Sequence, residues 1–361
     1  MADRFAGKIA SGEWPPGSRV AAGTALAQEL GVSRNTAHRA VEELQRRGLV
    51  VRRKGSGTVV AERERPALRR VALLMDYLAP HQNYPSADLV RGLHEGLGEN
   101  TDLIVVQNSG DLATEARQLA SLSEEVDGIV IYPIARNETA AVYDRLRQRG
   151  YPIVALDRRH VNVDCDAVFT DDREGARRAV AALIAGGRRK VGFISFRRPF
   201  FQSVHERHEG YREALLGAGI KPCDEDARWF PRDCSHDMGP FLSLVRDTMY
   251  ALTHRAEPID ALFCVEDVFA LSAIQASSDL GLRVPEDMEI VTFSDWPPNL
   301  LPTPWNVHRV VPRKDEIGRA AARLLRSRLA DPRRPSETIR VSGNFFHSGA
   351  SLFEEPVPLA D

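Results

Sequence analysis

The chain has 361 residues, enough for two or three domains with full-sized cores, and a net charge of −2 at pH 7. Its charge is unevenly distributed: residues 1–65 hold 12 Lys and Arg against 7 Asp and Glu, whereas the remainder holds 36 against 43. A small basic head on a larger acidic body is typical of a protein in which only the head meets a polyanion.

The N-terminal segment lacks the apolar core of a signal peptide, and no apolar run is long enough to span a membrane. We therefore expect a soluble, cytoplasmic chain. The cysteines are widely spaced and form no CxxC pair, which predicts buried thiols in a reducing compartment. They are Cys165, Cys223, Cys234 and Cys264.

The head begins with two short predicted helices. Residues 3–11 place Phe5, Ala6 and Ile9 on one helical face, and a Gly- and Pro-rich stretch then ends that helix. A second helix is predicted over about residues 24–30, before Gly31.

The third predicted helix starts after Ser33, whose hydroxyl is expected to cap its first turn, and ends at Gly48. Apolar residues recur on its helical period and should face the second helix, which makes a helix-turn-helix. These residues are Ala37, Ala40, Val41 and Leu44. The opposite face carries long donors in its first two turns, where a recognition helix enters the major groove. These donors are Arg34, Asn35, His38 and Arg39.

The segment LVVRRKGSGTVV, residues 49–60, predicts a strand, a basic turn and a second strand. Gly55 and Gly57 permit a tight reversal, and three cations lie beside it to contact the DNA backbone. The cations are Arg52, Arg53 and Lys54. The head is therefore predicted to be a winged helix-turn-helix over residues 1–62, followed by a linker over residues 63–70.

Residues 71–361 alternate short apolar runs with amphipathic stretches, which predicts a doubly wound α/β fold with parallel sheets. Strands are predicted at 71–75, 103–107, 128–132, 152–156, 191–195, 261–265 and 289–293. Helices are predicted at 86–98, 112–124, 137–149, 172–186, 204–217, 239–255, 267–280 and 315–330. Polar or Pro-rich segments at 157–170 and 294–312 interrupt the pattern, and we interpret them as crossings between two lobes.

Sequence patterns of catalysis are absent. The pair His205 and His208 does not match HExxH, and neither a GxSxG elbow nor a GxGxxG loop occurs. The adjacent acids Asp171-Asp172 and Glu266-Asp267 are expected to be solvated or to cap helices. We therefore expect no enzyme, no cofactor and no metal.

The order of motifs between residues 9 and 61, including GVSRNTAHRAVEELQRRG and the wing, resembles the GntR-type winged helix. That resemblance implies DNA contacts at Arg34, Asn35, Thr36 and Arg39, with the wing tip beside them. The wing tip comprises Gly55, Ser56, Gly57 and Thr58. The family usually has LPSERELA where this chain has VAAGTALA, so a threonine, Thr24, stands near an expected basic contact.

From about Val71 to Ser351 the body resembles the effector domain of the LacI/GalR repressors, which is similar to periplasmic sugar-binding proteins. The resemblance is carried by VDGIVIYP, YPIVALDRR, RHEGYREAL and DALFCVEDVFALSAIQ, among others. It implies two flavodoxin-like lobes that close on a ligand by hinge motion, in a homodimer.

Ligands of open α/β sheets bind outside the carboxyl ends of the strands. The residues at these ends, which suit a polyol, are Asp157, Arg158, Phe196, Glu266, Asp267, Ser294, Asp295 and Trp296. By resemblance, Arg207 of the R-x-x-G-Y motif is the main anchor, Asp157 another contact, and Tyr84 lines the cleft; a structural salt bridge is the alternative for Arg207. Glu266 and Ser294 depart from the family pattern. The predicted ligand is therefore a sugar, a sugar acid or a non-sugar metabolite.

The sequence therefore predicts a regulator whose binding to operator DNA is switched by a small molecule, and specifically a repressor of carbohydrate-use genes. A regulator with a non-sugar effector and a solute-binding receptor are the alternatives. The basic head favours a regulator over a receptor.

Overall fold

In a computed structural model, the chain forms two compact units, residues 1–67 and residues 68–361, and their division falls inside the predicted linker. The structure describes residues 5, 8, 14, 17–21, 27, 32–46, 49–53, 57–60, 68–75, 87–108, 111–134, 139–158, 164–197, 202–231, 237–294 and 307–347. None of the helices in these ranges is long and apolar enough to cross a membrane.

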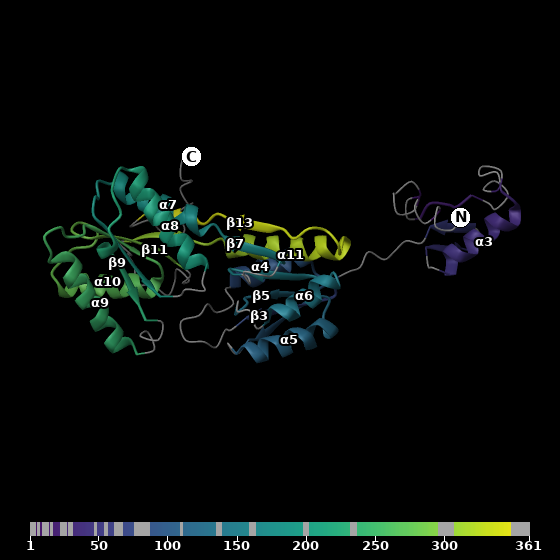
Figure 1. The fold of residues 1–361 in the computed structure, drawn as a ribbon, viewed down its shortest axis with the longest axis horizontal. Helices are drawn as coiled ribbons and strands as arrows, with labels where there is room; N and C mark the ends of the chain where they lie inside the picture. The colour runs from purple at the N-terminus through teal and green to yellow at the C-terminus, as the bar shows by residue number, and fades with distance from the viewer. Residues whose placement is uncertain are drawn as a thin grey trace. The chain divides into compact units, whose positions relative to one another are not determined.

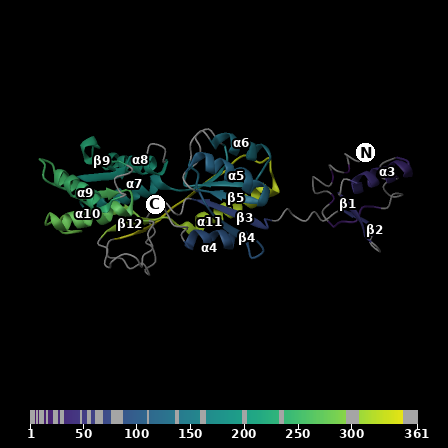
Figure 2. The same cartoon turned by 90° about the horizontal axis from the view of Figure 1, so that it is seen from below.

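The head contains helix α3 (Arg34–Arg46) and an antiparallel pair of strands, β1 (Val50–Arg53) and β2 (Gly57–Val60) (Figure 2). The predicted stripe on α3 is confirmed: Ala37, Ala40 and Leu44 are buried, and Val41 packs against the same core. Phe5 is fully buried in this core and stacks on Trp14 with ring centroids 5.2 Å apart. Most of the first two predicted helices lies outside the described residues.

The body consists of two lobes, each a six-stranded sheet between helices. In the N-lobe the strand order is β13-β7-β6-β5-β3-β4, and in the C-lobe it is β14-β12-β11-β10-β8-β9. The first five strands of each lobe follow the flavodoxin-like order 2-1-3-4-5. The doubly wound α/β fold in two lobes is therefore confirmed.

The N-lobe strands are β3 (Arg70–Met75), β4 (Asp102–Gln107), β5 (Gly128–Ile131), β6 (Ile153–Leu156), β7 (Asp166–Thr170) and β13 (Thr338–Val341). Its helices are α4 (Ala87–Leu97), α5 (Leu112–Glu125), α6 (Ala140–Gln148) and α11 (Lys314–Ala330). Helices α4 and α11 cover one face of the sheet, and α5 and α6 cover the other (Figure 1). The central strands are buried on both faces, which explains their unbroken apolar runs.

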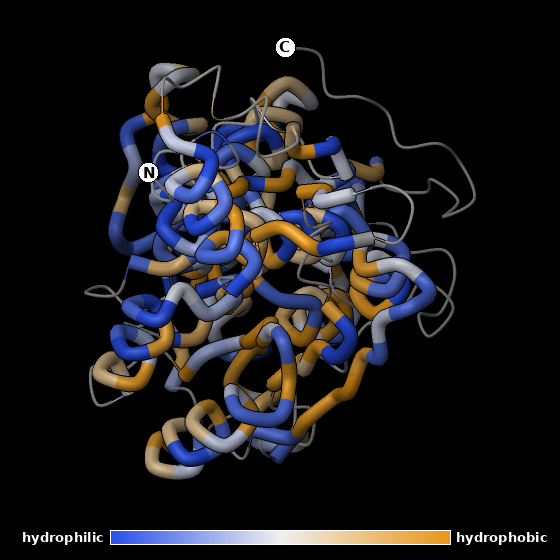
Figure 3. The backbone as a smooth tube through the Cα atoms, turned by 90° about the vertical axis from the view of Figure 1, so that its right-hand side faces the viewer, coloured by the Kyte–Doolittle hydropathy of each residue, from blue (hydrophilic) through white to orange (hydrophobic). Residues whose placement is uncertain are grey.

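The C-lobe strands are β8 (Val191–Phe196), β9 (Ala227–Phe230), β10 (Ala261–Cys264), β11 (Glu289–Phe293), β12 (His308–Val311) and β14 (Asn344–Phe346). Its helices are α7 (Asp172–Ala185), α8 (Gln202–Gly217), α9 (Met238–Thr253) and α10 (Asp267–Asp279), with a short turn of 3-10 helix, η2 (Asp224–Asp226). Helices α7 and α8 lie on one face, and α9 and α10 on the other. Figure 3 shows hydrophilic and hydrophobic residues mixed along the helical turns of the backbone, as amphipathic covering helices require.

The chain passes between the lobes after β7, after β12 and after β13. The interpretation of 157–170 and 294–312 as crossings between the lobes was therefore wrong in part, because these segments contain β7 and β12 and the chain crosses only after each strand. Each of these strands buries a polar side chain: Asp166 of β7 is buried, and the buried His308 of β12 has its Nε2 2.6 Å from Glu289 Oε1 of β11. Strands β9, β13 and β14 were also missed.

One cysteine differs from the expectation that the thiols are buried. Cys165 and Cys264 are buried, but Cys223 is exposed and its thiol lies 2.7 Å from Glu225 Oε2. Cys234 lies outside the described residues.

Candidate functional site

The first turn of α3 is capped as the sequence predicts. The Ser33 hydroxyl oxygen accepts the backbone N–H of Thr36 at 3.1 Å and lies 2.8 Å from the Thr36 hydroxyl oxygen. This cap fixes where the helix begins, and therefore which side chains its first two turns present. Thr36 takes part in the cap in addition to its predicted role on DNA.

The predicted DNA-contacting residues of α3 lie together on its exposed face. Arg34, Asn35, Thr36, His38 and Arg39 are all exposed, opposite the buried stripe. His38 Nδ1 lies 3.4 Å from Glu42 Oε1, one turn later. The first two turns thus present two arginines, an amide and an imidazole, which are side chains that read base edges or bind phosphate.

The wing forms as predicted, with β1 and β2 in register over four residue pairs. Arg52 is exposed opposite Thr58, and the backbone of Arg53 lies opposite Gly57. The turn between the strands, with Lys54, Gly55 and Ser56, lies outside the described residues. Gly57 has φ 78°, a conformation that L side chains rarely adopt.

The predicted effector residues Asp157 and Arg207 meet at one cavity between the lobes. Asp157 follows β6 of the N-lobe, and Arg207 lies on α8 of the C-lobe. The other residues that line the cavity are Tyr132, Val168, Thr170, Pro312, Lys314 and Ile317. Charged groups from both lobes, Asp157 and Lys314 on one side and Arg207 on the other, together with hydroxyls and apolar surface, suit a small polar ligand.

Asp157 has an unusual backbone. Its φ is 63°, and the N–H of Arg158 bonds to the carbonyl of Leu156 at 2.7 Å, which makes a tight γ-turn around Asp157. Arg158 Nε lies 3.6 Å from Asp157 Oδ2. A non-glycine residue in this region costs roughly 1–3 kcal/mol, and such residues cluster at functional sites.

The backbone strain at Asp157 can be tested separately from the predicted contact of its carboxylate with the effector. Asp157→Gly and Asp157→Ala remove the same carboxylate, but only glycine adopts a φ of 63° readily. We expect the Gly variant to be more stable than the Ala variant by about 1 kcal/mol in urea unfolding, because a Cβ is disfavoured in this region. Neither variant should respond to the effector. Equal stabilities would contradict the strain, and an unchanged effector response would contradict the contact.

Arg207 is held firmly at the cavity. Its Nε donates to Asp172 Oδ1 at 2.7 Å, and its Nη1 donates to the carbonyl of Val265 at 2.9 Å. Its guanidinium carbon also lies 3.9 Å from the centroid of the Phe293 ring. The alternative for Arg207, a structural salt bridge, is therefore present, and Asp172 orients a guanidinium that borders the cavity. The role of Arg207 as a ligand anchor stays a prediction.

Gly210 explains why the R-x-x-G-Y motif needs its glycine. A Cβ there would lie 2.1 Å from the carbonyl oxygen of Arg173 on α7. Helix α8 can approach α7 closely only because residue 210 has no side chain, and this approach brings Arg207 to Asp172 at the start of α7.

Of the other predicted effector residues in the described ranges, none lines this cavity; these are Arg158, Phe196, Glu266, Asp267 and Ser294. Phe196 is completely buried in the C-lobe core, where it contacts Phe241 and Phe269, so its ring is not available for stacking on a ligand. Asp267 and Ser294 are also buried, and Glu266 precedes α10. Tyr84, Asp295 and Trp296 lie outside the described residues.

The N-lobe also contains a buried carboxyl that sequence reasoning missed. Glu115 of α5 is fully buried, and its Oε2 accepts Asn108 Nδ2 at 2.7 Å and the backbone N–H of Ile134 at 2.8 Å. Burial raises the pKa of the Glu115 carboxyl, while the positive charge of Arg158 acts against this rise. Glu115 thus joins the segments that follow β4 and β5.

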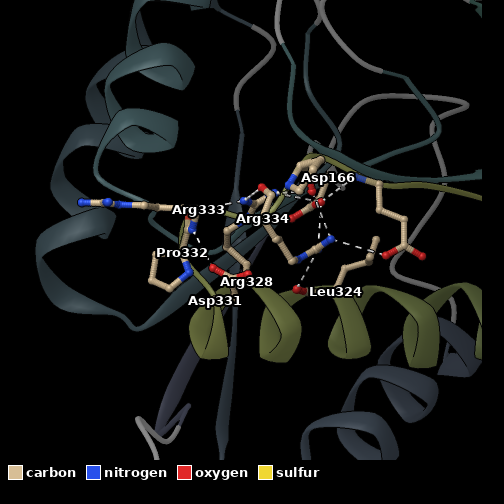
Figure 4. Close-up of polar contacts among 9 residues, drawn as sticks. Asp166, Leu324, Arg328, Asp331, Pro332, Arg333 and Arg334 are labelled. Carbon is tan, nitrogen blue, oxygen red and sulfur yellow. Dashed lines mark hydrogen bonds and ion pairs between the residues drawn. The ribbon is translucent and has the colours of Figure 1, made fainter. Parts of the chain in front are cut away.

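A second buried cluster lies at the start of β7, whereas the cavity is lined by Thr170 at the end of this strand. Figure 4 shows the side chains of the cluster. Asp166, the first residue of β7, accepts Arg328 Nε at 3.0 Å and the backbone N–H of Glu337 at 2.9 Å, and pairs with Arg334 Nη2 at 2.9 Å. These contacts tie the end of α11 and the segment before β13 to β7. The cluster holds the fold rather than a ligand.

Comparisons with known proteins agree with this geometry. Residues 2–60 match the model of the bacterial regulatory proteins of the gntR family, and residues 180–349 match a periplasmic binding protein-like domain. The arabinose metabolism transcriptional repressor of Geobacillus stearothermophilus is 26% identical over 80% of this chain and 79% of its own length. The ribose operon repressor of Haemophilus influenzae is 26% identical over 70% of this chain and 73% of its own.

Among solved structures, the complex of the transcriptional regulator CelR with cellobiose superposes with a TM-score of 0.65 at 21% identity. It covers 90% of this chain and 98% of its own. At this identity the likeness concerns the fold alone. The two repressors named above regulate transcription and are not enzymes.

Proposed function

Because the chain is a DNA-binding transcriptional regulator that joins a gntR-family head to a periplasmic binding protein-like body, we propose that it represses carbohydrate-use genes in response to a sugar or a related small molecule. The proposed effector site rests on one observation: Asp157 and Arg207, from different lobes, border the same cavity. Two of its relatives are repressors of arabinose metabolism and of the ribose operon, which supports a sugar. A non-sugar effector is the alternative.

The chemistry of the cavity suits a polyol. A carboxylate such as that of Asp157 accepts hydrogen bonds from a pair of hydroxyls, and the guanidinium of Arg207 donates to hydroxyl or ring oxygens. Because the two groups belong to different lobes, a ligand that contacts both stabilises the closed arrangement over the open one. The effector thus shifts a population of existing conformations.

We further propose that the regulator acts as a cytoplasmic homodimer on operator DNA. Two heads on one face of a duplex must reach major grooves about 34 Å apart, so a small rotation of the lobes is enough to change operator affinity. In each head, α3 enters the major groove and the wing contacts the adjacent backbone. The units 1–62, 63–70 and 71–361 are the proposed head, linker and effector domain.

The DNA-binding proposal is tested with Arg34→Ala and Arg39→Ala on DNA from the chain's own promoter region. Both residues are exposed in the first two turns of α3, so each variant should bind about ten-fold or more weakly, with little loss of stability. Arg46→Ala is the matched control, because Arg46 is exposed at the far end of α3 and pairs with Glu43. Wild-type affinity of both test variants in an anisotropy titration would contradict the proposal.

A further inference from the structure

The wing of the head includes a third extended segment that is not apparent in the sequence. The N–H of Gly17 bonds to the carbonyl of Val60 at 3.0 Å, and the N–H of Val60 bonds to the carbonyl of Ser18 at 2.8 Å. The N–H of Val20 bonds to the carbonyl of Thr58 at 2.9 Å, and Arg19 forms a bridge with Val59. Residues 17–20 therefore lie along β2 as a third strand, which fixes the backbone of Arg19 against the wing.

The side chain of Arg19 reaches the end of the wing. Side chains alternate across a sheet, so Arg19 shares a face with Val59 and with Gly57, two residues nearer the turn. Arg19 Nε and Nη2 each lie 3.4 Å from the point where a Cβ of Gly57 would be. The guanidinium thus lies over the bare backbone of Gly57, where the basic turn begins.

The charge of Arg19 is available to a partner. The residue is exposed, and none of the carboxylates in the described ranges forms an ion pair with it. A planar guanidinium on a rigid hairpin suits a phosphate, since little freedom is lost when it binds. The segment VAAGTALA has Thr24 where the resembled family usually has a basic residue, and Arg19 is a cation just before this segment.

We propose that Arg19 is a DNA-contacting residue that binds a backbone phosphate beside the wing, outside the base pairs that α3 reads. The next residue, Val20, points into the hydrophobic core of the head. Because side chains alternate along an extended segment, that of Arg19 projects from the opposite, outer face of the wing. Arg19 therefore adds affinity without sequence preference, and together with the exposed Arg52 it makes the wing a clamp on the backbone. This inference rests on the proposed DNA binding.

The test compares Arg19→Ala with wild type on two duplexes, one from the promoter region and one unrelated in sequence. We expect both affinities to fall by the same factor, about ten-fold, and the salt slope to fall by about one per head, because one phosphate contact is lost. Arg19→Lys keeps the charge and should restore the slope. Arg46→Ala is again the matched arginine control.

The outcomes separate this inference from the proposed function. If Arg19→Ala binds DNA with wild-type affinity and salt slope while Arg39→Ala loses binding, the inference about Arg19 is overturned but the proposed function as a regulator stands. A loss confined to the promoter duplex, or one accompanied by a lower melting temperature, would also overturn it, since it would indicate base reading or support of the fold. If Arg34→Ala and Arg39→Ala bind normally as well, the proposed function itself fails.

Discussion

Asp166→Asn is expected to lower the free energy of unfolding of the body by about 3–5 kcal/mol, because it removes the negative charge shared by two largely buried arginines. The Asp166 side chain is 1% exposed, and those of Arg328 and Arg334 are 9% and 14% exposed. Urea unfolding of the full chain measures the loss. Since the cluster joins α11 and the segment before β13 to β7, the loss should appear in the transition of the body.

The control is an ion pair of similar length on the surface. Arg149 Nη1 lies 2.8 Å from Glu124 Oε1, with side chains 57% and 66% exposed. Glu124→Gln should leave the urea midpoint unchanged within error, because solvent screens exposed pairs. An Asp166→Asn variant that is no less stable than Glu124→Gln would contradict the assigned role of the cluster.

The second large effect is expected at Arg207. Arg207→Met should destabilise the body by about 3–5 kcal/mol, because the buried carboxylate of Asp172 loses its guanidinium partner. Adding Asp172→Asn removes that charge and should restore most of the stability. Neither variant should be stabilised by a ligand that stabilises wild type in a thermal shift with arabinose, ribose and cellobiose.

Two outcomes would count against this account of Arg207. If the double variant stays as unstable as Arg207→Met, Asp172 is not the source of the loss. If a sugar stabilises the double variant as much as wild type, Arg207 does not contact the ligand. Arg173→Met is the matched control, since Arg173 is an exposed arginine on α7 that pairs with Glu213.

The apolar strands and the α-helices of the body that the structure describes, α4 to α11, were predictable because their patterns are strong. Strands such as β5 and β6 are buried on both faces and read as unbroken apolar runs. Strands β7 and β12 were missed because each buries polar residues whose partners lie far along the chain: Asp166 pairs with Arg328, and His308 lies beside Glu289. No local pattern reveals such a partner.

The sequence predicts more of the DNA-binding surface than of the effector site. The exposed face of α3 follows from the helical period and its cap, which the structure contains. The motifs pointed to Asp157 and Arg207, and the structure brings both to one cavity. The strained turn at Asp157 and the bridge between Arg19 and Val59 depend on backbone conformation and strand register, which residue types do not encode locally. Phe196 failed as a contact because aromatic neighbours cover its ring.

The central claim is that a ligand in the cleft of the body controls the head. Its most direct test is an anisotropy titration of promoter DNA, at fixed salt, with a sugar that stabilises the wild-type chain. The account predicts that this sugar changes the Kd of wild type for DNA by about ten-fold or more, in line with a coupling of a few kcal/mol. The variant with Arg207→Met and Asp172→Asn should bind the same DNA with wild-type affinity and ignore the sugar. A sugar that stabilises wild type but leaves its DNA affinity unchanged, or shifts both proteins equally, would contradict the account.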